Sequence, residues 1–134
     1  MTISLARVAT DRPARYGHQL VGHMGRKITA SWDEETATGR LTMDRGGERT
    51  GVCDISCEDG ALILRVEADE AHVERVEHVV GIHLARFGYK DALAVSWVRE
   101  DGTPGTTQGP LSAEDMARHA AEKKARLAAQ SSQS

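Results

Sequence analysis

Aromatic residues and long apolar runs are both scarce in this sequence. One Phe, two Tyr and two Trp occur among 134 residues, so aliphatic side chains must fill most of any core. The uninterrupted apolar runs span only a few residues, which excludes a transmembrane helix. The N-terminus also lacks the apolar segment of a secretory signal. We therefore expect a cytoplasmic protein with one domain and a modest core.

A surplus of basic residues is also missing. Lys and Arg number 17 against 20 Asp and Glu, for a formal net charge of −3. Nucleic-acid binding relies on a basic surface, so this balance argues against nucleic acid as the main partner. Five early cations leave a local basic patch open as an alternative, although we interpret them first as a solvated rim around one helix. They are Arg7, Arg12, Arg15, Arg26 and Lys27.

Cysteine is limited to Cys53 and Cys57, so the chain has no disulfide framework. Their segment has the pattern of a strand, in which four residues separate the two sulfurs by roughly 13 Å. That separation excludes both a disulfide and shared coordination of one metal ion. We expect both residues to be buried as small apolar side chains, with Cys53 at most a lone thiol.

Hydrophobic periodicity predicts an α+β fold. Alternating apolar residues indicate strands, and stretches with a period near 3.6 indicate two helices among them. The expected order is β-α-β-β-β-β-α-β, a two-layer sandwich in which a mostly antiparallel sheet carries two helices on one face, followed by a C-terminal helix. The strands are expected at about residues 3–10, 27–32, 39–43, 52–56, 61–67 and 92–98.

The first helix is expected to begin at an Asp11 cap and to end near Gly25. On this helix Tyr16, Gln19 and His23 are expected to lie together on the side that faces away from the core. They are therefore free to act as candidate ligand-binding residues.

The second helix, within residues 68–89, has the clearest apolar stripe in the chain. At roughly 100° per residue its apolar positions fall within about a third of the circumference, which is typical of a helix docked on a core. His83 lies at the margin of the stripe, where a side chain can be half buried and still reach a ligand. The stripe consists of Val73, Val76, Val80, Leu84 and Phe87.

Composition divides the chain into four parts. They are an α+β domain at residues 1–99, a linker at 100–111, a helix at 112–129 that opens with a Ser112–Asp115 capping box, and a disordered tail at 130–134. One sheet face has no helix to cover it, which leaves homodimerisation through that face as an open alternative. Ala61, Ile63, Ala94 and Val98 are expected to point to it.

Five segments follow one another in an order that is distinctive as a set: ARVATDRPARYGHQL, GHMGRK, DGALILRVEA, VVGIHLARFG and LAVSW. From about Leu5 to Arg99 the chain thereby resembles the bacterial domain of unknown function 2218 family. Members of that family occur alone and also joined to or near flavin-dependent siderophore-interacting reductases. The resemblance therefore implies a role in iron or siderophore handling, with such a reductase as a partner.

The resemblance also bears on the candidate site residues. Tyr16, Gln19 and His23 match the family pattern of the first helix, and a histidine is common in the family at the position of His83. Arg26 stands where a second histidine often follows the first. If the family binds a metal through that second histidine, this chain lacks one ligand.

The residues themselves point to a site between the two helices. HExxH, P-loop, GxSxG and dinucleotide fingerprints are all absent, and His18 and His23 diverge by about 140° on a helix. Because both helices cover the same sheet face, His23 and His83 could approach each other across the groove between them, with Tyr16 nearby. Such a pair would suit iron, haem or another transition metal, with a carboxylate, water or a second subunit completing the coordination. The competing interpretation is that His83 bonds a strand carbonyl while His23 only decorates a solvent-exposed face.

We therefore expect a non-catalytic accessory domain that binds a small ligand or a metal, in bacterial iron or siderophore handling. Tyr16, Gln19, His23 and His83 are the candidate ligand-binding residues, and His23 and His83 the candidate metal ligands. Iron or another transition metal is the candidate cofactor, and no membrane partner is expected. Two alternatives stay open: an interaction module that partners a flavin-dependent reductase, and a small enzyme with a histidine base and Cys53 as nucleophile.

Overall fold

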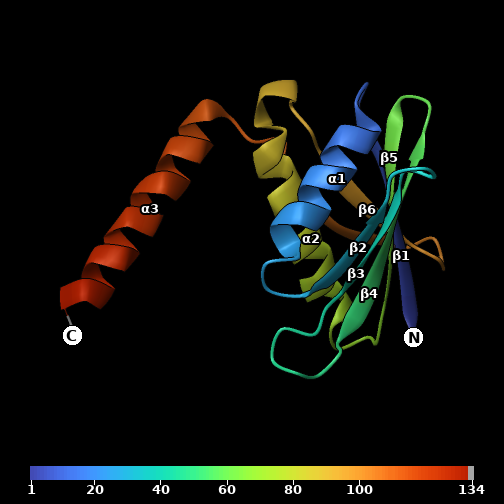
Figure 1. Ribbon diagram of the computed structural model, residues 1–134, viewed down its shortest axis with the longest axis horizontal. Helices are drawn as coiled ribbons and strands as arrows, with labels where there is room; N and C mark the ends of the chain where they lie inside the picture. Colours follow the sequence, from blue (N-terminus) through green and yellow to red (C-terminus); the bar gives the residue numbers. More distant parts are fainter. Residues whose placement is uncertain (133–134) are drawn as a thin grey trace.

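The computed structural model describes residues 1–132, which form one sheet with its helices on a single side (Figure 1). The expected two-layer α+β fold is confirmed. The elements, in chain order, are β1 (Thr2–Ala9), α1 (Pro13–Met24), β2 (Thr29–Asp33), β3 (Thr38–Thr42), β4 (Gly51–Glu58), β5 (Ala61–Ala68), α2 (Val73–Phe87), the short 3₁₀ helix η1 (Tyr89–Asp91), β6 (Val95–Arg99), β7 (Pro104–Gln108) and α3 (Ala113–Ser132).

Within residues 1–132 the strands form a seven-stranded antiparallel sheet in the order β2-β3-β4-β5-β1-β6-β7. The N-terminal strand lies inside the sheet, between β5 and β6. It pairs with β5 along its whole length, from Thr2 opposite Ala68 to Ala9 opposite Ala61. β1 therefore joins the four-stranded meander β2–β5 to the C-terminal hairpin β6–β7.

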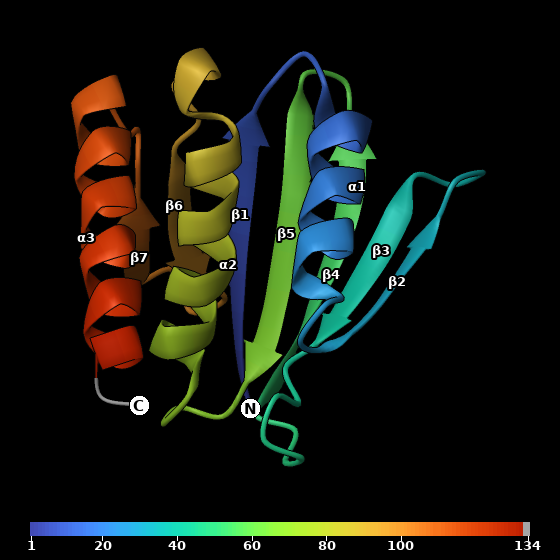
Figure 2. The same cartoon turned by 60° about the vertical axis from the view of Figure 1, so that its left-hand side comes forward.

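The helices α1 and α2 divide one face of the sheet between them (Figure 2). α1 packs on the half that contains β2 to β5, and α2 packs on β5, β1, β6 and β7. The apolar stripe that the sequence predicts for α2 faces the sheet, because Val73, Val76, Val80 and Leu84 are buried and Phe87 is partly buried. The periodicity of α2 thus predicted its docking correctly.

The face and the start of α1 differ from the expectation. The cap position is Arg12, with no side-chain cap, and Pro13 occupies the first helical position, where its missing N–H costs nothing. The expected Asp11 cap is therefore wrong. Tyr16 is buried, so it does not face away from the core as expected. Its burial is tolerated because its hydroxyl donates a hydrogen bond to Asp91 at the edge of the core.

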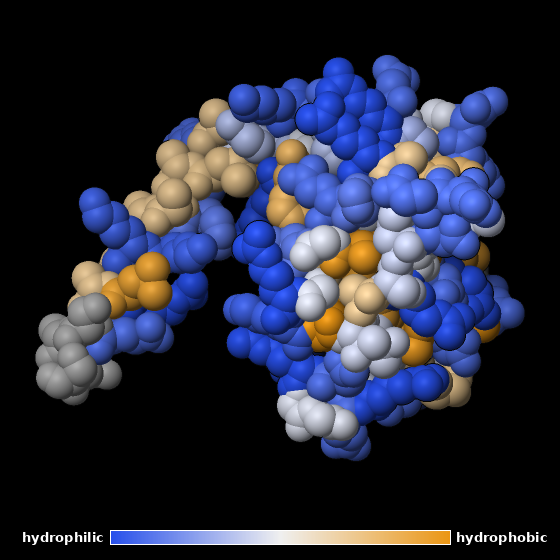
Figure 3. Space-filling model, in the orientation of Figure 1, coloured by the Kyte–Doolittle hydropathy of each residue, from blue (hydrophilic) through white to orange (hydrophobic). Residues whose placement is uncertain are grey.

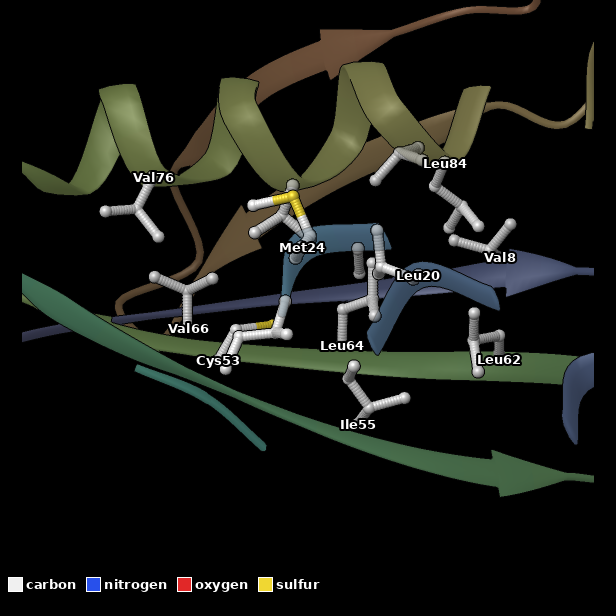
Figure 4. Close-up of a cluster of buried hydrophobic side chains, with 14 of the residues drawn as sticks. Val8, Leu20, Met24, Cys53, Ile55, Leu62, Leu64, Val66, Val76 and Leu84 are labelled. Atoms are coloured by element: carbon white, nitrogen blue, oxygen red, sulfur yellow. The ribbon is translucent and has the colours of Figure 1, made fainter. Parts of the chain in front are cut away.

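Aliphatic side chains fill the core between the sheet and the helices, as the scarcity of aromatics requires. Figure 4 shows Leu20 and Met24 of α1 lying between α2 and the strands, close to Leu64 of β5. Trp97 of β6, 1% exposed, is the largest fully buried side chain. The two helices are held side by side by this shared core.

A buried glutamate ties α2 to the far edge of the sheet. Glu77 is fully buried and accepts a hydrogen bond from Ser4 Oγ of β1 at 2.5 Å. Arg99 of β6 donates to the same carboxylate from Nε at 3.2 Å and from Nη2 at 3.3 Å. Thr106 of β7 donates from its backbone N–H at 3.1 Å and from its hydroxyl at 3.0 Å. One carboxylate on α2 therefore links three strands.

The linker expected at residues 100–111 is wrong in its central part, because Pro104–Gln108 form strand β7. This segment has few apolar residues, and polar contacts hold it instead. Gln108 is buried, and its side-chain oxygen accepts a hydrogen bond from Trp97 Nε1 at 2.7 Å. Composition cannot reveal such pairing, since the partners come from elsewhere in the chain.

The C-terminal helix α3 begins as the capping box predicts. Ser112 Oγ accepts from the backbone N–H of Asp115 at 3.0 Å, and the Asp115 carboxylate accepts from the backbone N–H of Ser112 at 2.9 Å. The helix continues to Ser132, so the expected disorder at 130–132 is wrong, and residues 133–134 of that expected tail lie outside the described residues. Figures 1 and 2 show α3 beside α2 but standing away from the sheet.

The sheet face opposite the helices carries two exposed apolar side chains on neighbouring strands. Leu5 and Val98 are paired across β1 and β6, and they are 43% and 50% exposed. Ile63 is half-buried as expected for this face, whereas Ala61 is fully buried. No helix within residues 1–132 combines the length and apolar character that crossing a bilayer requires.

Candidate functional site

Two histidines from different helices lie side by side. His23 is in the last turn of α1 and His83 is in the second half of α2, and the centroids of their rings are 5.0 Å apart with a 42° angle between the planes. Phe87, one turn after His83, presents its ring edge-on to His23 at 5.1 Å. The antiparallel packing of both helices on one core brings these rings together, although 60 positions separate them in the chain.

The hydrogen bond of His83 determines which of its two ring nitrogens is available to a ligand. Nδ1 lies 2.7 Å from the backbone carbonyl oxygen of Val79, one turn earlier in α2. A carbonyl only accepts, so Nδ1 carries the proton and donates it. In the neutral ring Nε2 is then an unprotonated nitrogen that can accept a hydrogen bond or coordinate a metal. The carbonyl partner expected by the competing interpretation therefore exists, but it belongs to the helix itself.

The surroundings of His23 favour its neutral form. Burial lowers the pKa of His23, and the charges of His83, Arg26, Lys27 and Lys123 lower it further. Both effects disfavour the imidazolium, the first by removing water and the second by like-charge repulsion. At neutral pH the His23 ring is therefore uncharged, which is the form of imidazole that binds a metal ion.

Both rings line a groove of about 840 Å³, which we call the interhelical groove. Its walls are the end of α1 with residues 26–28, the loop within residues 43–50, the outer side of α2 from His72 to Phe87, and α3 at His119, Lys123 and Arg126. Figure 3 shows the hollow between α3 and the rest of the molecule, with many hydrophilic residues along its rim. A volume of this size is typical of small-molecule sites.

The other two candidate residues of α1 do not line the groove. Gln19 is exposed. The buried Tyr16 donates its hydroxyl to the Asp91 carboxylate, which ties α1 to η1. That hydrogen bond is the main reason that the pKa of Tyr16 is raised, and burial adds to it. The structure therefore brings together His23 and His83 of the four candidates and leaves Tyr16 and Gln19 elsewhere.

Cys53 lacks the properties of a catalytic nucleophile. It is fully buried in β4, and burial is the main cause that raises its pKa to about 12. The thiolate, which is the reactive form, is therefore not populated near neutral pH. Cys57 is partly buried, and burial raises its pKa as well. The alternative of an enzyme with Cys53 as nucleophile loses its reacting group.

Within residues 1–132 no three His, Cys, Asp or Glu side chains gather closely enough to hold a metal ion by themselves. A metal at His23 and His83 would need its other ligands from solvent or from a bound molecule. Of the cations in the groove walls, sequence reasoning singled out only Arg26 and Lys27, within the alternative of a local basic patch, and it missed the others. Those come from the 43–50 loop, α2 and α3, so no local pattern indicates that they meet.

A comparison with known protein families identifies the family of this chain. Residues 5–98 match the family described as "Uncharacterized protein conserved in bacteria (DUF2218)". The chain belongs to this family. The matched range of this DUF2218 chain includes His23 and His83 and ends before β7 and α3. The α3 wall of the interhelical groove therefore lies outside the part that the family shares.

A solved structure similar to this DUF2218 chain supports the fold. The NMR structure of PA4090 from Pseudomonas aeruginosa matches with a TM-score of 0.56 and 23% sequence identity, over 77% of this chain and 99% of that chain. At this level of identity the likeness concerns the fold alone. A search among curated proteins finds no match.

Proposed function

We propose that this chain is a non-catalytic accessory domain that binds a small ligand or a metal through His23 and His83. The observation that carries the proposal is the juxtaposition of the two imidazoles, 5.0 Å between centroids, in the wall of the interhelical groove. We further propose a role in bacterial iron or siderophore handling, with a transition metal or its chelate as the ligand; this role is what the resemblance described above implies.

The chemistry of His83 favours a coordinating role. Metal-bound histidines usually donate their second ring N–H to a carboxylate, a backbone carbonyl or water, which fixes the ring and its tautomer. The bond from Nδ1 to the Val79 carbonyl oxygen is of that kind and leaves Nε2 available. Fixing the ring before a ligand arrives reduces the entropy that binding costs.

The spacing of the rings fits two ligands of one ion. An imidazole nitrogen lies about 2.1 Å from a bound transition metal, so two such rings in a tetrahedral arrangement have centroids roughly 5 Å apart. The separation of His23 and His83 is 5.0 Å. Two imidazoles leave coordination positions open, and a chelating ligand with its own oxygen donors would fill them.

The interaction-module alternative finds its support on the opposite side of the sheet. The exposed pair Leu5 and Val98 gives that face a small apolar patch. Such a patch suits a protein partner, either a second copy of this chain or a flavin-dependent reductase. The histidine pair is the more specific feature, because an exposed valine or leucine is ordinary on a protein surface.

Substitution of His83 by alanine is expected to weaken metal binding at least about tenfold, since even second-shell changes at metal sites cost 10–100-fold. The full-length protein, purified without metal, is titrated with Co²⁺ and with Fe²⁺ under anaerobic conditions. Calorimetry gives the affinity, and the visible spectrum of Co²⁺ reports nitrogen coordination. The unsubstituted protein is expected to bind one equivalent.

His78→Ala is the matched control, because His78 is an exposed histidine on the same helix and does not line the groove. Its affinity for Co²⁺ is expected to stay within about twofold of the original protein, as is usual for a surface change. Equal affinities of the original protein and of His83→Ala, or no binding by either, would sink the proposal.

A further inference from the structure

The interhelical groove concentrates positive charge in a chain whose net charge is negative. Seven of the 17 Lys and Arg residues line it, against one of the 20 Asp and Glu, Glu48. Outside the groove, acidic residues therefore outnumber basic ones by nine. The seven cations are Arg26, Lys27, Arg45, Arg75, Arg86, Lys123 and Arg126.

None of these seven cations forms an ion pair with a described residue. Elsewhere on the surface, cations do find acidic neighbours, as Arg7 does with Glu58 at 3.5 Å and Arg40 with Asp54 at 2.8 Å. Unpaired like charges around one hollow repel one another and focus a positive potential in it. A bound anion would remove that repulsion.

The floor of the groove is apolar. Its lining includes Met24, Ile28, Met43, Val76, Val79 and Phe87, and the volume is about 840 Å³. Apolar surface that is framed by a few charged groups is the usual make-up of a small-molecule site. The cations come from four separate segments of the chain, which are the turn after α1, the 43–50 loop, α2 and α3.

We infer that the interhelical groove binds a small organic anion with several phosphate or carboxylate groups, whose apolar part rests on the floor beside His23 and His83. The inference deepens the proposed function, because it names the charge and chemical class of the ligand at the same site. A metal would then enter as a chelate whose negative charge meets the cations. A bare metal ion would still bind the two imidazoles, but more weakly than such a chelate, because the cations oppose its charge.

The helix α3 supplies a wall that the family match does not include. Lys123 and Arg126 line the groove from exposed positions on α3, whereas Arg118 and Lys124 on the same helix do not line it. Charges on the two sets can therefore be changed equally, without touching the core. Such a pair of variants separates a local effect of the groove from an effect of net charge.

Lys123→Glu/Arg126→Glu is expected to weaken binding of tripolyphosphate at least about tenfold, because two attractive contacts become repulsive. Calorimetry on the metal-free, full-length protein in 50 mM NaCl measures the affinity, with citrate as the carboxylate counterpart. The original protein is expected to bind at least one of the two in the micromolar range and to lose affinity at 200 mM NaCl. The tighter of the two probes identifies phosphate or carboxylate as the preferred group.

Arg118→Glu/Lys124→Glu carries the same change of net charge and is expected to bind within about twofold of the original protein. Equal losses in the two double variants would overturn the inference, as would no binding of either anion at 1 mM. Tighter binding of a 20-base-pair DNA duplex than of both anions would overturn it as well. These measurements contain no metal, so their failure leaves the result of the Co²⁺ titration intact, and the reverse also holds.

Discussion

Replacement of Glu77 by alanine is expected to lower the free energy of unfolding by about 3–5 kcal/mol, the usual cost of removing one partner from a buried ion pair. The carboxylate is fully buried, and its partner Arg99 is only 24% exposed at the side chain. The substitution also leaves the buried hydroxyl of Ser4 and the backbone N–H of Thr106 without their acceptor. Urea denaturation of the purified variant measures the loss.

Two further variants of α2 test whether the lost stability comes from the hydrogen bonds of Glu77. Glu77→Gln keeps the shape but places an amide N–H₂ against Arg99, so an intermediate loss is expected. Glu74→Ala removes an exposed glutamate from the first turn of the same helix and is expected to cost only about 0.5 kcal/mol. A loss at Glu77→Ala no larger than at Glu74→Ala would show that the network does not hold α2 to the sheet.

The same network gives stability a dependence on pH. Burial alone would raise the pKa of Glu77, but the hydrogen bonds from Arg99, Ser4 and Thr106 outweigh it, so the folded-state pKa is lowered. The carboxylate therefore contributes its full stabilisation above the ordinary glutamate value of about 4.3, and this is lost as pH falls through the folded-state pKa. Stability of the original protein is expected to fall more steeply below about pH 4 than that of Glu77→Gln.

Gly81→Ala is expected to destabilise the protein by about 2–4 kcal/mol, although alanine is the better helix former. A Cβ at position 81 of α2 would lie 1.9 Å from Gln108 Oε1 and 2.7 Å from its Cδ. Gln108 is buried, and the same oxygen accepts the indole N–H of Trp97. Moving it breaks that bond and shifts β7, so the clash outweighs the gain of about 1 kcal/mol in helix propensity.

Gly22→Ala in α1 is the matched control for this glycine. Nothing lies within 4 Å of a Cβ at that position. The helix therefore gains propensity without a clash, and an increase of about 0.5–1 kcal/mol in the free energy of unfolding is expected. Thermal denaturation of both variants gives the comparison, and a stabilising Gly81→Ala would contradict the packing of α2 against β7.

Local patterns were sufficient to predict most of the fold. The stripe from Val73 to Leu84 and the alternation in β5 depend only on neighbouring residues, and the structure places both against the core. β7 escaped this kind of reasoning, since Pro104–Gln108 are held by Glu77 and Trp97 from other elements. Glu77 itself occupies a buried position on α2, where sequence alone predicts an apolar residue.

The site could be predicted only in part, for a related reason. Helices that cover one face must lie side by side, which was enough to expect His23 near His83. The position of Tyr16 depends on its contact with Asp91, 75 residues later. The basic groove draws its cations from Arg26 through to Arg126, and the net charge of −3 conceals their convergence.

The central claim is that the interhelical groove around His23 and His83 is where this protein binds its ligand. A titration of ¹⁵N-labelled full-length protein with tripolyphosphate, followed by ¹H–¹⁵N correlation NMR, tests it most directly. The expected result is saturable shifts confined to the end of α1, the outer side of α2, the 43–50 loop and the facing side of α3. Shifts centred on Leu5 and Val98 of the open sheet face, or no saturable shifts at all, would contradict the claim.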